Sequence, residues 1–599
     1  TVLVKGAKSG TKTDANGNFT ITAKTGDVLV ISSVNFGSQQ TKVKDGGNVT
    51  VNMIAKDGTM DEVVVTAMDI KKAPRELGYS VQTVKGAEVA ETQRENFINA
   101  LQGRVAGLSV TPTTGTAGAS SGIILRGFNT LSGTNQPLFI IDGIIVDNTT
   151  FNSNSQGGSG VGLASDGANR NIDNTNRIAD LNPNDIESYT ILKGPEATAL
   201  YGSQASSGAI VITTKRAKLT GKKIAVTYDN NFRMQKLTRF AKVNNEYGPG
   251  ASNGNPDPVG RFTSFGPKWP AGTQLYDNVN NFYETGFSQT HNLGLEFGIK
   301  NVSFRASGQY LNNSGVVPNN FYKKYTGRIS NTTKIGKYIT ITPSVAYSYA
   351  DNKKPTKGSS SYLMSLYQWP ANNNIQKYQD DYGGKITLFN ANPNADFDNP
   401  VWSTKNNIMG DITRRWIATM GIDIKPFEWL NVSGRFGYDT YKTDGYIMIH
   451  PQSFYLTAGT LGTLENYYTT YKGYNHTITA SAKKEWKGFT ARLLVGTMWQ
   501  DFETQQYAVF GNRIADSIVG GKIYKYGNIV TSWNPTDSNL TAPGSRVRLQ
   551  RAASKGLPNL RQFRELAYFG EVSLGYKNVA FLTYSQRFEK ASPIPPKNN

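Results

Sequence analysis

The chain has 599 residues, enough for several domains, no cysteine and a formal net charge of +20. The lack of cysteine excludes disulfides, thiolate chemistry and cysteine-ligated metals. The three histidines, His291, His450 and His476, do not stand at metal-ligand spacing, so no metal site is expected.

Residues 1–56 alternate in short segments separated by glycine turns, such as the Asn16-Gly17 step within residues 11–43 (TKTDANGNFTITAKTGDVLVISSVNFGSQQTKV). This pattern predicts a small β-sandwich over residues 1–57. We expect its first strand to be missing before Thr1, so that the chain begins inside that module.

Residues 61–67 read DEVVVTA, and three consecutive valines favour an extended backbone. We expect no partner strand nearby in sequence. Two interpretations stay open: a buried strand of the preceding domain, or a free edge that another protein completes by adding a strand.

Residues 68–85 form a polar connector that contains Pro74, and residues 87–101 are expected to be helical because Val89, Phe97, Ile98 and Leu101 share one face. Four segments then follow in order: residues 101–110 (LQGRVAGLSV), 123–128 (IILRGF), 137–143 (PLFIIDG) and 191–215 (ILKGPEATALYGSQASSGAIVITTK).

From residue 222 onward apolar and polar residues alternate with a period of two. In residues 292–299, Leu293, Leu295, Phe297 and Ile299 alternate with Asn, Gly and Glu, and Lys300-Asn301 is a two-residue turn. The same pattern marks residues 302–310, 339–349, 416–424, 430–438, 489–499, 568–576 and 580–584.

A soluble sandwich or an up-and-down barrel would both show this alternation. Short turns on one side, including residues 425–429, and long polar excursions over 351–414 and 502–564 favour a transmembrane barrel. Aromatic residues near strand ends would then lie at the headgroup level: Tyr347, Tyr349, Trp416, Trp429, Tyr438 and Trp499.

The positive charge is scattered rather than gathered along one element, so no nucleic-acid partner is expected. Contact of the barrel rims with outer-membrane lipid headgroups and lipopolysaccharide phosphates accounts for it more economically. A basic lumen that attracts acidic cargo is the alternative.

In their order, the four segments of residues 101–215 resemble the plug domain of TonB-dependent outer-membrane transporters, most closely the SusC/RagA class of Bacteroidota. Residues 11–43 resemble the carboxypeptidase-regulatory-like β-sandwich that precedes this plug. The resemblance implies a mainly β chain: the sandwich over 1–57, a TonB box and linker over 58–85, an α/β plug over 86–218, and a large antiparallel transmembrane β-barrel over 219–599.

In this family the DEVVVTA stretch is the handle that the TonB C-terminal domain grips, which implies a TonB box formed by Asp61, Glu62, Val63, Val64, Val65, Thr66 and Ala67. The resemblance also implies plug-motif positions that set turns and salt-linked packing against the barrel wall rather than touch substrate: Arg126, Gly127, Asp142, Gly143, Gly194, Pro195, Tyr201 and Gly202.

The class implies proton-motive-force-energised import of an oligosaccharide or oligopeptide beneath a SusD-like surface lipoprotein, with the N-terminal module in the periplasm. Tyr362, Tyr367, Trp369 and Trp402 are candidates for contact with a glycan or peptide substrate or with that lipoprotein. No nucleophile elbow, Walker loop or zinc motif is present, so neither enzyme activity nor a cofactor is expected.

Two other interpretations stay open. The chain would serve as a structural subunit of an outer-membrane protein assembly or export complex, or as a soluble β-sandwich adhesin. About eleven strands are expected after residue 222, whereas a plugged barrel of this class has about 22. The sequence therefore predicts that further barrel strands follow Asn599 and that residues 580–584 form an open edge.

Overall fold

The computed structural model describes residues 2–4, 10–14, 17–33, 39–43, 49–53, 64–65, 71–72, 80–131, 135–149, 173–217, 224–250, 266–356, 361–381, 383–388, 396–455, 462–512, 517–519, 522–525, 528–530, 548–550, 560–577 and 579–592. It contains two compact units, Thr1–Val65 with Lys71–Leu77, and Thr66–Ile70 with Gly78–Asn599. The finer domain bounds stay predictions.

The first unit contains a four-stranded antiparallel sheet in the order β2 (Gly10–Thr11), β1 (Val2–Val4), β3 (Val28–Ile31) and β4 (Gln39–Lys42). Val2, Leu29 and Ile31 form its buried core, against which Phe19 and Ile21 pack. Apolar residues at alternate positions of β3 supply this core, as the sequence pattern indicates.

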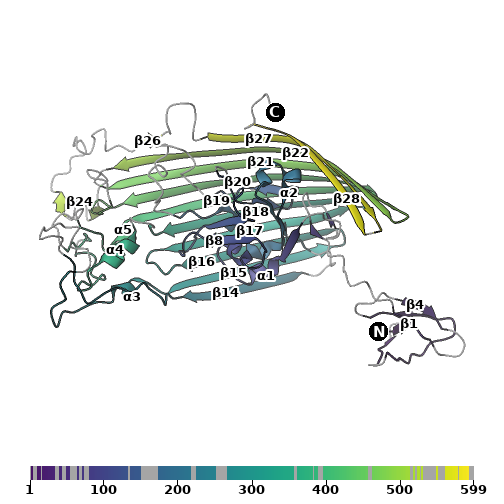
Figure 1. The fold of residues 1–599 in the computed structure, drawn as a ribbon, viewed down its shortest axis with the longest axis horizontal. Coiled ribbons are helices and arrows are strands. Elements are labelled where there is room, and N and C mark those ends of the chain that lie inside the picture. Colours follow the sequence, from purple (N-terminus) through teal and green to yellow (C-terminus); the bar gives the residue numbers. More distant parts are fainter. Residues whose placement is uncertain are drawn as a thin grey trace. The chain divides into compact units, whose positions relative to one another are not determined.

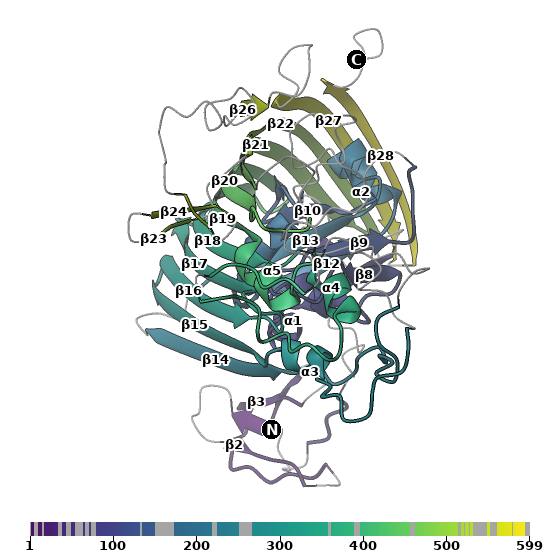
Figure 2. The ribbon, with the colours of Figure 1, turned by 90° about the vertical axis from the view of Figure 1, so that its left-hand side faces the viewer.

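The plug part of the second unit is built on a five-stranded sheet. Its order is β11 (Ile144–Val146), β10 (Leu138–Ile141), β13 (Ala209–Thr214), β12 (Ile186–Leu192) and β7 (Val81–Lys85), with β10 and β13 parallel. A separate hairpin pairs β8 (Leu108–Pro112) with β9 (Ser121–Leu125). Figure 2 shows these strands inside the arc of the larger sheet.

The helix expected over residues 87–101 is interrupted, so that prediction is wrong in its length. The structure has α1 (Gly86–Ala90) and, after a turn, a 3-10 helix over Phe97–Leu101. The Asn96 side chain accepts a hydrogen bond from the Ile98 amide and begins the second helix. Val89, Phe97, Ile98 and Leu101 still enter one core, because the break keeps all four on the inner side.

A large antiparallel sheet curves around one side of the plug (Figure 1). Its path runs through eleven strands, and β26 (Arg548–Gln550) pairs with β22 beside it. The path is β14 (Ala225–Gln235), β15 (Gly286–Ile299), β16 (Val302–Ser314), β17 (Phe321–Ile335), β18 (Ile339–Lys354), β19 (Ile408–Phe427), β20 (Leu430–Ile449), β21 (Thr463–Trp486), β22 (Phe489–Asn512), β27 (Leu560–Tyr576) and β28 (Ala580–Ala591).

The alternation of residue types sets which face of this sheet meets the plug. In β15, Leu293, Leu295 and Phe297 are exposed, whereas Thr290 and Asn292 are buried. Polar residues thus point inward toward the plug and apolar residues outward, as predicted for a barrel wall. Within the described residues β28 has one ladder partner in this path, β27, as expected for an edge.

Connections alternate between short and long. Short turns join β15 to β16, β17 to β18, β19 to β20, β21 to β22 and β27 to β28, while longer connections join the remaining neighbours, the shortest of them being residues 315–320 between β16 and β17. The predicted excursions over 351–414 and 502–564 are shorter than expected, because β18 continues to Lys354, β19 begins at Ile408, β22 continues to Asn512 and β27 begins at Leu560. Inward-facing polar residues let the ladders extend beyond the apolar band.

The β18–β19 connection carries α4 (Tyr362–Gln368) and α5 (Pro400–Asn406), and α3 (Asn278–Phe282) precedes β15. Ser361, Asn399 and Asp277 cap these helices by accepting amide hydrogen bonds. Within the described residues, no helix is long and apolar enough to cross a membrane.

Candidate functional site

The segment predicted to be a handle has a partner of its own. Val64 and Val65 form β5 (Val64–Val65), which pairs antiparallel with β6 (Lys71–Lys72). The expectation that no partner strand lies nearby in sequence is therefore wrong, because the chain turns back on itself. Asp61, Glu62, Val63, Thr66 and Ala67 lie outside the described residues.

Two of the predicted plug-motif steps are left-handed turns. Arg126 and Gly127 have φ of 59° and 95°, and Asp142 and Gly143 have φ of 49° and 87°. A positive φ is sterically unfavourable for Arg and Asp, so the backbone is strained at Arg126 and Asp142. The glycine that follows each of them adopts a positive φ without this cost. The Arg126 amide donates to the Gly107 carbonyl at 2.8 Å, and its side chain is exposed.

A third motif step forms α2 (Pro195–Tyr201). Gly194 precedes it, Pro195 occupies its first turn and Tyr201 is buried. Gly202 ends the helix at φ 82°. A Cβ at Gly202 would lie within 3.1 Å of charged side-chain atoms on Arg587, Glu565 and Glu589, so glycine lets α2 approach the wall closely.

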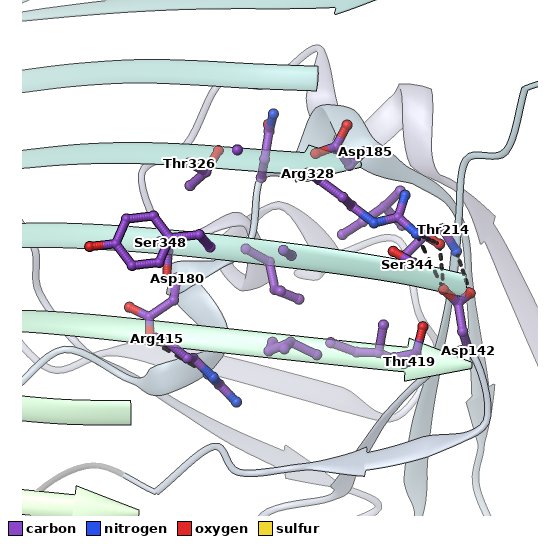
Figure 3. A pocket seen from close by; sticks show the side chains of 18 residues that line it. Asp142, Asp180, Asp185, Thr214, Thr326, Arg328, Ser344, Ser348, Arg415 and Thr419 are labelled. Atoms are coloured by element: carbon purple, nitrogen blue, oxygen red, sulfur yellow. Dashed lines mark hydrogen bonds and ion pairs between the residues drawn. The ribbon is translucent and has the colours of Figure 1, made fainter. Parts of the chain in front are cut away.

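The first plug–wall anchor is a buried aspartate between β10 and β11. The Asp142 carboxylate accepts hydrogen bonds from the amide and hydroxyl of Thr214. Arg328 of β17 reaches the same carboxylate at 3.5 Å and also donates to the Thr214 hydroxyl (Figure 3). This group borders a cavity of about 50 Å³ that Asp180, Asp185 and Arg415 also line.

The second anchor is centred on Arg415 of β19. Its Nε and Nη2 donate to the two oxygens of Asp439 on β20 at 2.8 and 2.7 Å. The remaining contacts reach the plug: Nη1 donates to the Arg177 carbonyl at 2.6 Å and Nη2 to the Asp147 carbonyl at 2.9 Å. Arg415 and Asp439 are 1% and 0% exposed, so this pair is removed from water.

Asp147 completes this anchor from the plug. Its amide donates to Asp439 at 3.0 Å, and its carboxylate accepts from the Tyr441 hydroxyl at 2.8 Å. Burial raises the pKa of Asp147, while the Thr149 hydroxyl and the Arg415 charge partly oppose that rise. The buried environment of the Asp147 carboxylate thus disfavours its charged form.

Further polar contacts extend along the wall. Arg305 of β16 lies 3.3 Å from Asp185, and Lys324 of β17 donates to the Ala179 and Leu181 carbonyls at 2.8 and 3.0 Å. Asn475 of β21 accepts from and donates to the Ile145 backbone, at 3.3 and 2.9 Å.

Two parts of the interface are apolar. A Cβ at Gly437 of β20 would lie 2.2 Å from Cγ2 of Ile144, so only glycine leaves room for this plug side chain. At the other end, α2 residues Ala197, Leu200 and Tyr201 share a buried cluster with wall residues Leu494, Met498, Ala567 and Phe569. The polar anchors fix orientation, and these clusters supply burial.

The aromatic candidates of the long connections lie in a core of their own. Trp369 is 7% exposed and packs with Phe282 and Leu366, while Tyr362 and Tyr367 pack against the same cluster. Trp402 is 0% exposed and forms an edge contact with His450. Because both rings are buried, neither Trp369 nor Trp402 offers the open surface expected of a residue that contacts a substrate or the lipoprotein.

A buried ion pair stabilises the same connections. Lys385 and Asp398, both fully buried, are 2.7 Å apart, and Lys385 also donates to the Asp396 carbonyl at 2.6 Å. Asp398 further accepts from Asn407 and from the Phe454 amide. This ion pair and these hydrogen bonds therefore hold the loop segments around residues 385, 398 and 453 together.

Sequence reasoning did not single out Arg415, Asp439, Arg328 or Asp147. The available signal was charge at inward positions of β19 and β20, because the period-two pattern already puts Arg415 on the polar face. Which plug residue meets it depends on long-range packing. Within the described ranges, no group of three or more His, Cys, Asp or Glu side chains could hold a metal ion.

Comparison with protein-family models finds two matches. Residues 73–209 match the TonB-dependent receptor plug domain, and residues 1–65 match the CarboxypepD_reg-like domain. The TonB-dependent receptor SusC of Bacteroides thetaiotaomicron is 30% identical over 416 residues, which are 68% of this chain and 38% of that protein. Receptor P26 of Formosa agariphila is 26% identical over 608 residues, covering 100% of this chain and 55% of P26.

The chain thus spans about half the length of these relatives or less. Among solved structures it is similar to the RagAB peptide importer in its open-open state, with a TM-score of 0.64 and 17% identity, over 89% of this chain and 56% of that one. At this identity the similarity concerns the fold: a plug within a large antiparallel barrel wall.

Proposed function

Because this chain is a SusC-like TonB-dependent receptor of the Gram-negative outer membrane, we propose that the protein imports an oligosaccharide or oligopeptide with energy from the proton-motive force. A SusD-like surface lipoprotein would deliver the cargo, and the TonB C-terminal domain would transmit the force. The buried polar contacts between the plug and the wall, centred on Arg415, carry the proposal. We call these contacts the polar seat of the plug.

A plug that must separate from the wall and return needs contacts that fix its position but can be broken reversibly. The anchors at Arg328, Arg415 and Asn475 are hydrogen bonds and ion pairs with defined geometry. Once separated, their partners can be hydrated, whereas an apolar interface would expose surface that promotes aggregation. A polar seat therefore supports reversible opening.

The cargo side of the plug also has polar character. A cavity of about 250 Å³ lies where the plug turn near Thr114 and Gly118 meets β14 and β17, and Arg94, Asn96 and Arg233 line it. Hydroxyl, amide and guanidinium groups suit hydrogen bonding to sugars or peptide backbones. The solved relative named as a peptide importer supports the same cargo range.

We further propose that the short turns face the periplasm, together with the N-terminal module and the handle. Outer-membrane barrels have short periplasmic turns and long outer loops. The end of the plug that leads on to β14 lies at the short-turn end, since the Ser303 hydroxyl beside the β15–β16 turn donates to the Ala217 carbonyl. A force applied from that side would draw on the plug.

Growth of a strain that lacks the gene tests this function. Loss of growth on one class of nutrient, complex glycans or oligopeptides, with normal growth on its monomers, would support import and identify the cargo. Unchanged growth on both, with co-purification of outer-membrane assembly or export proteins instead of a SusD-like lipoprotein, would overturn it in favour of the scaffold alternative.

A further inference from the structure

The outward face of the large sheet carries a line of aromatic rings that ends in cations. His291, Tyr310, Tyr325 and Tyr349 are register partners on β15 to β18, with successive ring centroids 6.2, 5.1 and 6.1 Å apart. Tyr349 pairs with Arg414, whose guanidinium lies 5.6 Å from that ring centroid. The line crosses five adjacent strands.

This line faces away from the plug. In β19 the neighbouring side chains alternate: Arg415 and Ile417 are buried against the plug, while Arg414 and Trp416 are 44% and 50% exposed. Because successive side chains of a strand point to opposite faces, the whole row of register partners shares the outward face. In a barrel wall that face meets the bilayer.

The β19 end of the row, at Arg414, lies at the depth of the outer headgroups. The short-turn end exposes aromatic rings at Phe427 and Trp429, and Trp416 is exposed eleven residues along β19 from Phe427. At about 3.3 Å per residue and a tilt of about 40°, this span rises about 28 Å, close to the apolar band of about 25 Å. Arg414, the next outward residue, lies just beyond that band.

Three more cations lie level with Arg414 or up to four residues nearer the long-connection end of the sheet. Lys323 and Lys353 lie 5.0 and 5.2 Å from the Phe321 ring centroid on β17, and Lys442 is the register partner of Arg414 on β20. We call Lys323, Lys353, Arg414 and Lys442 the outer cationic cluster. It spans the four adjacent strands β17 to β20, a width of roughly 15 Å at the usual strand spacing.

Two carboxylates set the geometry of the cluster without neutralising it. Asp444 lies 3.1 Å from Arg414 and 3.0 Å from Lys442, and Asp351 is the register partner of Lys323. Four cations against two anions leave an excess of two positive charges. Arg414 gives Asp444 one of its terminal nitrogens, so the remaining donors of its guanidinium can bind a second anion.

We propose that the outer cationic cluster binds the phosphate groups of lipopolysaccharide, with the tyrosine row lying against its adjoining sugar and acyl region. Charge complementarity, headgroup depth and the width of four strands fit a lipid that carries phosphates at two places on one headgroup. The site is separate from the plug and from the cargo path. It requires the outer-membrane setting but no particular cargo.

The test uses the full-length receptor in nanodiscs and purified bisphosphorylated lipid A as the probe. Arg414→Gln with Lys442→Gln removes two charges at exposed positions, where each cation contributes about fivefold at an anionic surface, so binding should weaken roughly 25-fold. Lys337→Gln with Lys577→Gln, at the short-turn end, removes the same charge and should bind as the wild type does.

Dephosphorylated lipid A should bind the wild type and the cluster variant equally weakly. Wild-type affinity in the cluster variant, an equal loss in the short-turn variant, or equally tight binding of phosphatidylglycerol by the wild type would each overturn the proposal. Resistance of the sheet to unfolding in detergent shows whether each variant is folded. Lys323→Gln with Lys353→Gln, on the neighbouring strands, should reproduce the effect independently.

Discussion

Asp439 is the residue on which the second anchor depends most, because it accepts from Arg415 through both oxygens and from the Asp147 amide. We expect Asp439→Asn to leave the buried Arg415 cation poorly compensated. Breaking a buried pair costs about 3–5 kcal/mol. Urea-dependent proteolysis of the plug should therefore begin at clearly lower urea than in the wild type.

Asp444→Asn is the matched control, since it changes the same charge on the same strand. Asp444 is partly exposed and pairs with Arg414 on the outward face, where an ion pair contributes about 0–1 kcal/mol. Plug proteolysis should match the wild type in this variant. If both variants release the plug alike, the plug is not held through the Arg415 anchor.

The raised pKa of Asp147 predicts that the seating of the plug depends on pH. Burial raises its pKa above the ordinary 3.8, so the seated form binds a proton more tightly than the released form. Its contribution to seating therefore grows as pH falls toward 3.8 and is lost as pH rises through the raised pKa. Asp147→Asn should flatten this part of the profile, measured as plug release between about pH 7 and pH 4. An unchanged profile would contradict the assignment.

The sequence predicts these residues only in part. Period-two alternation assigns Arg415 and Asp439 to the inward face, and the resemblance identifies Asp142 and Gly143. Their partners could not be predicted, because Arg415 meets residues more than 200 positions away. The buried positions of Trp369 and Trp402 were missed because aromatic residues in polar segments look alike whether they bind a ligand or form a small core.

At the scale of elements, variants in the β5–β6 hairpin distinguish two possible roles of the handle: adding a strand to TonB and forming its own hairpin. Val64→Pro and Lys72→Pro each remove a backbone donor from the same hairpin pair. If the handle works by adding a strand to TonB, Val64→Pro should abolish uptake while barrel insertion and lipoprotein binding stay normal.

Lys72→Pro disrupts the same hairpin but leaves the valine strand intact. It should keep uptake, measured as growth on the cognate nutrient with the receptor limiting. Equal loss of uptake in both variants would mean that the hairpin itself is required, and normal uptake in Val64→Pro would contradict energised import through this segment.

Strands of the large sheet were predictable as elements, and their ends were not. Alternation identifies residues 292–299 and 489–499, yet the structure extends these strands to Gly286–Ile299 and Phe489–Asn512. The extensions consist largely of polar residues, whose strand conformation is stabilised by neighbouring ladders rather than by local preference. The prediction of one helix over 87–101 was wrong in the other direction, because it was too long. The four apolar residues do share one buried side, but the helix is interrupted before Asn96.

At the scale of the whole molecule, the central claim is that the plug must separate from the wall for cargo to pass. Gly437 and Ile144 offer a direct test, because a Cβ at Gly437 would lie within 3.0 Å of both Cγ1 and Cγ2 of Ile144. That proximity suits a disulfide, which needs Cβ atoms about 3.5–4.5 Å apart. The chain has no cysteine, so an introduced pair has no competitor within it.

The measurement is uptake by cells that express the full-length receptor with Ile144→Cys and Gly437→Cys, before and after reduction. Ser573→Cys with Thr583→Cys is the control, since those hydroxyls lie 3.1 Å apart between β27 and β28 and their bond leaves the plug untethered. We predict that the oxidised plug–wall pair blocks uptake, that reductant restores it, and that the control transports in both states. Full uptake with the plug–wall disulfide verified as formed would contradict it.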